Sequence, residues 1–389
     1  MDIKLLELFG GIGACTKALK RLGINVNIVD YVEIDKYAVK SYNAINGTNF
    51  EPRDIREWDK DIEVDLIMHG SPCQDFSLAG KQAGGDKDSG TRSSLMYETI
   101  RIIEKLKPKY VLWENVKNIL SKKHIHNFNN YLKALRDLGY KNYYQVLNAK
   151  DYGIPQNRER VFVVSILGNR NYKFPIGIKC NNKINRLFNF SARQDCRVVY
   201  DNNGLCPTLV AGMGEGGRKV PMFIDRDFNF PQPQKLKLKL KDMLEDNVDE
   251  KYYLSDKMVK YISATGTANF RNPDSKINLD IARPLITDQN KRAGTINYLS
   301  NGLPNNYNLN DTGYISDSIR IRKLTPKECW RLMGFDDCDV DRCIKIGISN
   351  CQLYKQAGNS IVVNVLELEA IFRELFKESI NETSTNINR

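Results

Sequence analysis

The chain has 389 residues, 41% of them hydrophobic, and a net charge of +11 from 58 lysines and arginines against 47 acidic residues. This length is enough for two domains with a sizeable core, and no apolar run reaches the length of a membrane span. The nine cysteines include no CxxC pair, and there are only three histidines. We therefore expect neither a disulfide framework nor a zinc site of the usual spacing. The excess of basic residues indicates a polyanionic partner.

Strand and helix patterns alternate from residue 3 to about 168, which predicts an α/β fold with a doubly wound, mostly parallel sheet. The strand pattern begins at once and leaves no room for a signal peptide, so we expect a cytoplasmic protein. The expected strands are residues 3–9, 25–32, 64–68, 110–113 and 161–166, and the expected helices are residues 15–22, 37–46, 95–106 and 128–138.

The pattern changes between residues 170 and 320, where Asn, Gly and Pro are dense, and a second, smaller, β-rich domain is expected there. Residues 235–241 alternate Lys and Leu, which predicts a strand with one basic face. A ribbon facing phosphates and an ordinary solvated strand are equally good interpretations of this face. Helices are expected at residues 325–333 and 363–376.

A cysteine follows the third expected strand, in the segment Gly70-Ser71-Pro72-Cys73-Gln74. Proline fixes φ just before the thiol, so Cys73 is expected on a rigid turn at the carboxyl end of a strand. Open α/β sheets bind their ligands at that edge, which makes Cys73 a candidate nucleophile. On this segment alone, a turn cysteine without a function would be the better interpretation.

A glycine-rich turn, Phe9-Gly10-Gly11-Ile12-Gly13, follows the first expected strand. Such a turn lets a ligand approach the backbone and the N-terminus of the next helix. Glu33, 22 residues after Gly11 at the end of the second strand, can hold both hydroxyls of a ribose. The turn lacks a third glycine at the dinucleotide spacing, and this favours S-adenosylmethionine over NAD.

Two further segments are expected at the same edge of the sheet. Glu114 ends the fourth strand, where its carboxyl group and the Cys73 thiol can face one substrate; a helix cap or a salt bridge is the alternative role. Arg158 and Arg160 are two residues apart on an extended segment, so both can reach one site. Solvated surface arginines are the alternative here.

Taken in order, these segments and two later ones resemble the motifs of the DNA (cytosine-5)-methyltransferases of bacterial restriction-modification systems, from residue 3 to about 370. Each motif is modest alone, but six in this order are specific, and Glu7 stands where the family commonly has Asp. The motifs are Glu7-Leu8-Phe9-Gly10-Gly11-Ile12-Gly13, Gly70-Ser71-Pro72-Cys73-Gln74, Glu114-Asn115-Val116, Gln156-Asn157-Arg158-Glu159-Arg160, Arg322-Lys323-Leu324-Thr325-Pro326 with Arg331-Leu332-Met333-Gly334-Phe335, and Gln356-Ala357-Gly358-Asn359-Ser360.

The resemblance implies a Rossmann-like, S-adenosylmethionine-dependent methyltransferase that methylates carbon 5 of a flipped-out cytosine in a short double-stranded DNA sequence. It implies that Cys73 forms a covalent adduct with the base, that Glu114 holds the ring, and that Arg158 and Arg160 clamp the base's carbonyl oxygen. The implied cofactor residues are Phe9, Gly11 and Gly13 at the methionine end, Glu33 at the ribose, Ile34 on the adenine face, Asp54 and Ile55 at the adenine edge, and Pro72, Leu95, Asn359 and Ser360 around the rest of the pocket.

The same resemblance implies a catalytic and cofactor-binding domain at residues 1–172, a target-recognition domain at 173–345, and a segment at 346–389 that returns to the first domain. It implies a monomer without a metal ion, and any cognate restriction endonuclease would act separately. A tRNA cytosine-5-methyltransferase stays an alternative, although its variable region would be shorter. A non-catalytic DNA-binding protein would have no use for Cys73, Glu114 and Arg158. A nucleotide-binding oxidoreductase would leave Pro72-Cys73 unexplained.

Overall fold

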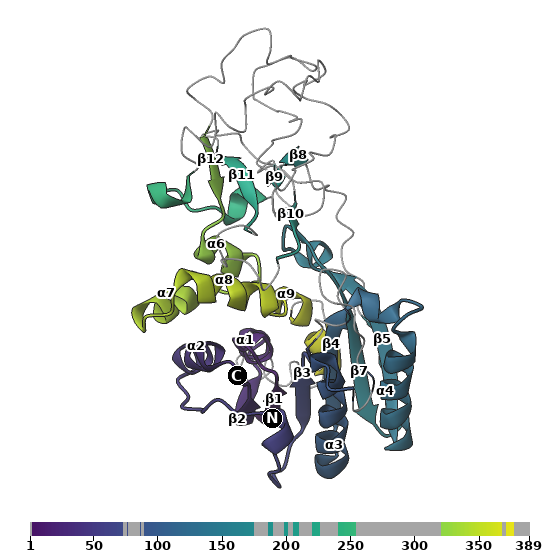
Figure 1. Cartoon of the computed structure of the whole chain (residues 1–389). Helices are drawn as coiled ribbons and strands as arrows, with labels where there is room; N and C mark the ends of the chain where they lie inside the picture. Colours follow the sequence, from purple (N-terminus) through teal and green to yellow (C-terminus); the bar gives the residue numbers. More distant parts are fainter. Residues whose placement is uncertain are drawn as a thin grey trace, which may run out of the picture.

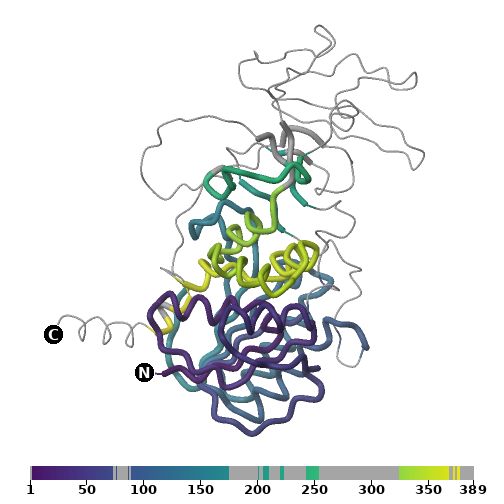
Figure 2. Tube along the Cα trace, turned by 90° about the vertical axis from the view of Figure 1, so that its left-hand side faces the viewer, coloured from purple at the N-terminus to yellow at the C-terminus, as the bar shows by residue number. Residues whose placement is uncertain are grey.

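Two main sheets with a layer of short helices between them make up most of the chain that the computed structural model describes (Figures 1 and 2). A third sheet has only two parallel strands, β6 (Gln156–Asn157) and β10 (Cys206–Pro207). The larger sheet has six strands in the order β2-β1-β3-β4-β7-β5. The described residues are 2–72, 76, 86, 89–174, 186–189, 198–200, 205–209, 220–225, 240–253, 320–367 and 371–376.

The large sheet is mostly parallel, as predicted. Strands β1 (Asp2–Leu8), β2 (Asn25–Val32), β3 (Leu66–His69) and β4 (Tyr110–Val116) run parallel to one another, whereas β7 (Glu159–Leu167) runs antiparallel to β4 and to β5 (Tyr140–Asn148). Strand β2 lies on one side of β1 in the sheet, and the next strand along the chain, β3, lies on the other side of β1. Ligands of such sheets bind where the strand order reverses, at the carboxyl ends of the strands.

Strand β5 was missing from the sequence expectations. It lies at the edge of the sheet, and most of its side chains are exposed or only half-buried. An edge strand of this kind does not need the apolar run by which buried strands are recognised.

Helices cover both faces of the large sheet. Helix α1 (Ala14–Arg21) lies against one face, whereas α3 (Met96–Leu106) and α4 (Ile125–Asp137) cover the other (Figure 1). Alternate side chains of a strand point to opposite faces, and accordingly Leu5 belongs to the buried cluster on the α1 side while Leu6 belongs to the cluster on the α3 and α4 side. Full burial of one such side chain contributes about 1.5–3 kcal/mol.

Helix α2 (Lys36–Asn46) follows β2 and is held at both ends. The Asp35 carboxylate accepts from the backbone N–H of Tyr37, and Gly47 adopts the left-handed conformation at φ 69°. These are favoured caps for the two ends of a helix. They fix the backbone directly after Glu33 and Ile34.

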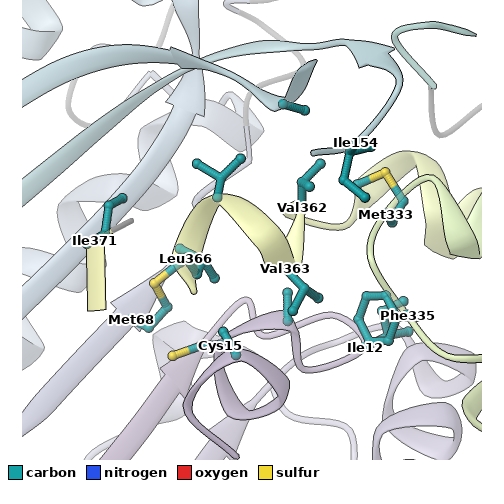
Figure 3. Packing of buried hydrophobic residues seen from close by; sticks show 14 of the residues in the cluster. Ile12, Cys15, Met68, Ile154, Met333, Phe335, Val362, Val363, Leu366 and Ile371 are labelled. Carbon is teal, nitrogen blue, oxygen red and sulfur yellow. The ribbon is translucent and has the colours of Figure 1, made fainter. Parts of the chain in front are cut away.

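The C-terminal helices return to the large sheet. Figure 3 shows Val363 and Leu366 of α9 (Val363–Leu366) packed beside Cys15 of α1 and Met68 of β3. The preceding helices form the middle layer and share this buried cluster. They are α6 (Pro326–Arg331), α7 (Asp337–Lys345) and α8 (Asn350–Asn359).

The expected single helix at residues 363–376 is wrong. Glu367 is extended, with φ −104° and ψ −165°, and it ends α9 before α10 (Ile371–Leu375) begins. The Glu367 carboxylate accepts from Arg21 of α1 at 3.1 Å, which makes a partly buried ion pair between α1 and the residue that ends α9. The helix expected at 325–333 is confirmed as α6, which Thr325 and Glu328 begin with a capping box.

The smaller sheet has four strands, in the order β12-β11-β9-β8. Of the expected Lys/Leu strand, residues 235–239 lie outside the described residues, and its last two residues begin a 3-10 helix at Leu240–Met243. Within the described part of the chain, no helix has the length and apolar character needed to cross a membrane. The strands are β8 (Arg186–Asn189), β9 (Val198–Tyr200), β11 (Met222–Asp225) and β12 (Arg320–Lys323).

Candidate functional site

The segment that leads to Cys73 is anchored on both sides of Glu114. Trp113 donates from Nε1 to the Ser71 hydroxyl at 3.0 Å. Asn115 donates from Nδ2 to the hydroxyl and the carbonyl oxygen of Ser71, both at 3.4 Å. A Cβ atom on Gly70 would lie 3.8 Å from the Glu114 carboxylate, so the structure brings this segment directly beside Glu114.

Cys73 itself lies outside the described residues, but the chain is held on both sides of it. It is two residues after Ser71 and three residues before Phe76. Phe76 is fully buried, and its carbonyl oxygen accepts from Asn118 at 2.6 Å. Asn115 belongs to the motif Glu114-Asn115-Val116, but the motif predicts no role for it, and Trp113 and Asn118 were not singled out as site residues.

Glu114 and Arg160 form an ion pair, with 3.1 Å between Oε1 and Nε. Burial raises the pKa of the Glu114 carboxyl, and the charges of Arg160 and Arg158 oppose that rise. Glu114, Arg158 and Arg160 line one small cavity together with Phe162 and Val365. The structure therefore brings together the acid and both arginines that the sequence indicated.

Arg158 has a different setting from Arg160. Its side chain is 3% exposed, and its guanidinium donates to the carbonyl oxygens of Leu209 at 2.8 Å, Ser360 at 2.8 Å and Gly358 at 3.2 Å. Arg158 lies between β6 and β7, and these bonds connect it with two segments that are 51 and 202 residues away.

The turn after β1 rests on two stacked tyrosines, Tyr31 and Tyr42, whose ring centroids are 3.8 Å apart. A Cβ atom on Gly10 would meet the Tyr31 ring at 2.6 Å, and one on Gly13 would meet the Tyr42 ring at 2.8 Å. Gly11 is different: among the described residues, no atom lies within 4 Å of the corresponding position. The tyrosine rings therefore pack against Gly10 and Gly13 of the turn, while the space beside Gly11 is open.

The backbone of this turn is strained in the way that ligand-binding turns often are. Phe9 has φ 52°, and Gly11 and Gly13 have φ 55° and 83°. A bulky residue in this region is unusual and marks a functional or strained position. The hydroxyl of Tyr31 donates to the Gly11 carbonyl oxygen at 2.6 Å and helps to hold the conformation.

Glu33 lies against the open glycine. Its carboxylate accepts from the backbone N–H of Gly11 at 3.2 Å and of Asp35 at 2.9 Å, and burial raises its pKa. The next residue, Ile34, is 66% exposed, which is unusual for a large apolar side chain. An acid and an exposed apolar surface next to an open glycine fit the ribose and the base of a nucleoside.

The segment expected at the adenine edge lies beside Glu33, because the Arg53 N–H donates to the Glu33 carbonyl oxygen at 2.8 Å. The Asp54 carboxylate accepts from the Arg56 N–H at 3.0 Å and caps a 3-10 helix (Ile55–Glu57). Ile55 is 3% exposed and packs inward.

The remaining expected cofactor residues differ in how far they are buried. Leu95 and Phe9 are partly buried against the same apolar cluster, Pro72 is half-buried, and Asn359 is exposed. Ser360 is 6% exposed at the end of α8. Helix α8 is tied to the cofactor side by an ion pair between Lys355 and Asp35 at 2.7 Å.

One group of metal-ligating side chains occurs among the described residues: Asp336, Cys338 and Asp339. Both acids already pair with Lys17, at 2.5 Å and 2.7 Å. This group joins α7 to α1 and lies apart from the residues of the candidate site.

A sheet of this order, with a glycine turn after β1 and an acid after β2, is typical of α/β proteins that bind a nucleoside-containing cofactor. The family model described as C-5 cytosine-specific DNA methylase matches residues 3–377. The chain belongs to this family, whose members are S-adenosylmethionine-dependent methyltransferases. The resemblance that the motifs indicated is thereby confirmed.

Among its relatives, the Type II methyltransferase M2.ScrFI of Lactococcus lactis subsp. cremoris is 38% identical over 365 residues, which cover 91% of this chain and 81% of that protein. The orphan methyltransferase M.SPBetaI of Bacillus phage SPbeta is 28% identical over 98% of this chain and 99% of its own length. The crystal structure of the S. pombe Dnmt2 methyltransferase matches 97% of this chain and 99% of its own, with a TM-score of 0.58 and 18% identity. This last likeness supports the fold.

Proposed function

We propose that the protein transfers a methyl group from S-adenosylmethionine to carbon 5 of a cytosine in a short, specific sequence of double-stranded DNA, as the methylating member of a restriction-modification system. The observation that carries the proposal is the anchoring of Ser71 by Trp113 and Asn115 on either side of Glu114. Cys73 follows Ser71 by only two residues, a reach of at most about 7 Å, which supports our proposal that its thiol attacks a base held by Glu114.

In the proposed reaction, the Cys73 thiolate adds to carbon 6 of the cytosine and makes carbon 5 nucleophilic. Bound S-adenosylmethionine supplies an electrophilic methyl group to carbon 5. Loss of the carbon-5 proton then expels the thiolate and restores the aromatic ring. The target atom is stacked inside a duplex, so the base must leave the helix to reach this site.

Glu114 is suited to hold the base during this reaction. Cytosine presents an acceptor at ring nitrogen 3 and a donor at the amino group, and a protonated carboxyl offers the matching donor and acceptor. Burial raises the pKa of Glu114 and so favours the protonated form. Arg160, 3.1 Å from Glu114, is proposed to face the carbonyl oxygen of the same base.

For the cofactor, we propose that Glu33 binds the ribose hydroxyls, Ile34 packs on the adenine, and the turn from Phe9 to Gly13 holds the methionine end. The open space at Gly11 and the exposed side chain of Ile34 support this assignment. Asp54, Ile55, Pro72, Leu95, Asn359 and Ser360 complete the proposed cofactor pocket.

The division of the chain into residues 1–172, 173–345 and 346–389 is part of the proposal, with DNA sequence recognition assigned to 173–345. The four-stranded sheet supports a separate role for that region, and the net charge of +11 supports a polyanionic partner. We further propose that the enzyme acts as a monomer without a metal ion, and separately from any cognate endonuclease.

The experiment that tests this function is covalent trapping on DNA whose cytosines carry fluorine at carbon 5. Fluorine cannot leave as a proton does, so the adduct persists after methyl transfer. We expect a denaturation-resistant complex with the wild-type chain and S-adenosylmethionine, and none with Cys73→Ser. A complex that forms equally well with Cys73→Ser would refute the covalent role, and trapping on tRNA but not on duplex DNA would refute the substrate.

A further inference from the structure

Two buried polar side chains, Gln156 and Arg158, project from one short segment next to the active site. They are 0% and 3% exposed. Because they are two residues apart on an extended segment, they lie on the same side of it. Buried polar groups are stable only where they are bonded, so their partners show what this pair does; we call the pair the Gln-Arg clasp.

The clasp binds both backbone groups of Leu209. The Leu209 N–H donates to Oε1 of Gln156 at 3.1 Å, and its carbonyl oxygen accepts from Arg158 at 2.8 Å. The neighbouring residue, Thr208, donates from its hydroxyl to the Asn157 carbonyl oxygen at 2.6 Å. Three consecutive residues of one segment thus hold two consecutive residues of the region proposed to recognise DNA.

The clasp also reaches the helical layer. Gln156 donates from Nε2 to the carbonyl oxygen of Leu332, after α6, at 2.8 Å. Arg158 donates to the carbonyl oxygens of Gly358 and Ser360 at the end of α8. The same guanidinium therefore joins the proposed recognition region to the segment that is proposed to border the cofactor.

Arg160 makes the contrast clear. It points to the Glu114 carboxylate, at 3.1 Å, whereas the terminal nitrogens of Arg158 donate to backbone carbonyl oxygens of distant segments. Charge-assisted bonds of this kind are about twice as strong as neutral ones. They suit a guanidinium that fixes the relative position of segments.

We propose that Arg158 is a positioning residue: together with Gln156 it fixes Leu209, and thereby the recognition region, to the active-site sheet, while Arg160 faces the base. This inference rests on the proposed function. It departs from the expectation that both arginines clamp the target cytosine. It implies that substitution of Arg158 weakens the protein's discrimination between cognate and altered DNA sequences, even when no base occupies the active site.

The test measures DNA binding without the target base. Two duplexes are used, one of cognate and one of altered sequence, and each has an abasic site at the target position. The dissociation constant for the altered duplex divided by that for the cognate duplex reports sequence discrimination alone. We expect Arg158→Lys to lower this ratio by about tenfold, equivalent to about 1.4 kcal/mol. The matched control, Arg160→Lys, should leave it within about twofold, because Arg160 pairs with Glu114 and would contact the base that is missing, not the recognition region.

A second readout needs no DNA. Hydrogen exchange of the Leu209 amide in the free protein should speed up in Arg158→Lys and stay unchanged in Arg160→Lys. If Arg158→Lys does not fold, Thr208→Val removes one bond from the recognition side and should have the same two effects on a smaller scale.

If Arg158→Lys leaves both the ratio of dissociation constants and the hydrogen exchange of the Leu209 amide unchanged, the proposed role of the clasp is refuted. A wild-type chain that methylates no DNA would instead refute the proposed function. In that case the exchange of Leu209 still decides whether Arg158 holds this segment.

Discussion

Glu33 and Ile34 are neighbours in the chain, yet they have opposite environments. The carboxylate of Glu33 accepts from two backbone N–H groups, while the apolar side chain of Ile34 is 66% exposed. Exposing a large apolar group has a cost, and an exposed apolar surface beside polar groups often marks a binding site. At the scale of single residues, this pair is the clearest sign of a nucleoside pocket.

Glu33→Ala should weaken S-adenosylmethionine binding by about tenfold or more, because hydrogen bonds to charged groups contribute about 1.5–3 kcal/mol each. Titration calorimetry measures this directly, with Glu51→Ala, an exposed acid, as the matched control. An unchanged dissociation constant would contradict the ribose assignment.

His69 gives a prediction about pH. It is fully buried, bonds Tyr131 at 2.6 Å, and burial lowers its pKa to about 3. An unfolded histidine binds a proton near pH 6.5, so the unfolded chain gains a proton that the folded chain does not, and the free energy of unfolding falls as pH drops below about 6.5.

His69→Gln removes this titration and keeps a polar group near Tyr131. The difference in unfolding free energy between the wild type and the variant should therefore shrink by about 1 kcal/mol between about pH 7 and about pH 5.5. Urea unfolding at both pH values measures it. A difference that does not vary with pH would show that His69 binds a proton as readily in the folded chain as in the unfolded chain, and would contradict the lowered pKa.

At the scale of elements, the turn after β1 depends on the tyrosines beneath it. Tyr31→Phe keeps the stack with Tyr42 but removes the bond to the Gly11 carbonyl oxygen. One neutral hydrogen bond contributes about 0.5–1.5 kcal/mol, so S-adenosylmethionine affinity should fall by about two- to tenfold with little loss of secondary structure. Tyr144→Phe, at an exposed site, serves as the control, and equal affinities for all three proteins would refute the role of Tyr31.

The elements that the sequence predicted well are those with strong apolar runs. Strands β1, β3 and β4 are mostly buried, and the edge strand β2 still carries the apolar pairs Ile28-Val29 and Tyr31-Val32, so their composition reveals them. The other edge strand, β5, has mostly exposed or half-buried side chains and was missed. The last helix was predicted too long because its amphipathic pattern continues past Glu367. At the break Glu367 pairs with Arg21, 346 residues away, and no local pattern reports such a partner.

The same distinction applies to the site. Strand-end positions could be predicted for Glu33 and Glu114, because the carboxyl ends of parallel strands share one edge of the sheet. The bonds that hold Ser71 and Arg158 could not, since they join segments 42 to 202 residues apart. Cys73 lies outside the described residues, and its role stays a prediction from its motif.

At the scale of the whole molecule, the chain leaves the large sheet after β7 and returns to it through α9 and α10. Residues between these points are therefore held at both ends by the same core. Such an arrangement allows the intervening region to vary while the reaction site stays the same.

Exchange of residues 175–320 for the corresponding region of a related methyltransferase should therefore change the methylated sequence and retain methyl transfer. Sequencing of the DNA methylated by the hybrid shows the outcome. A hybrid that is active on the original sequence would place recognition elsewhere in the chain.

The central claim is tested most directly by bisulfite sequencing of plasmid DNA from cells that express this chain, with Cys73→Ser as the paired control. We predict protected cytosines in one short recurring sequence with the wild type, and complete conversion with the variant. Complete conversion with abundant, folded wild-type protein would contradict sequence-specific cytosine methylation of DNA.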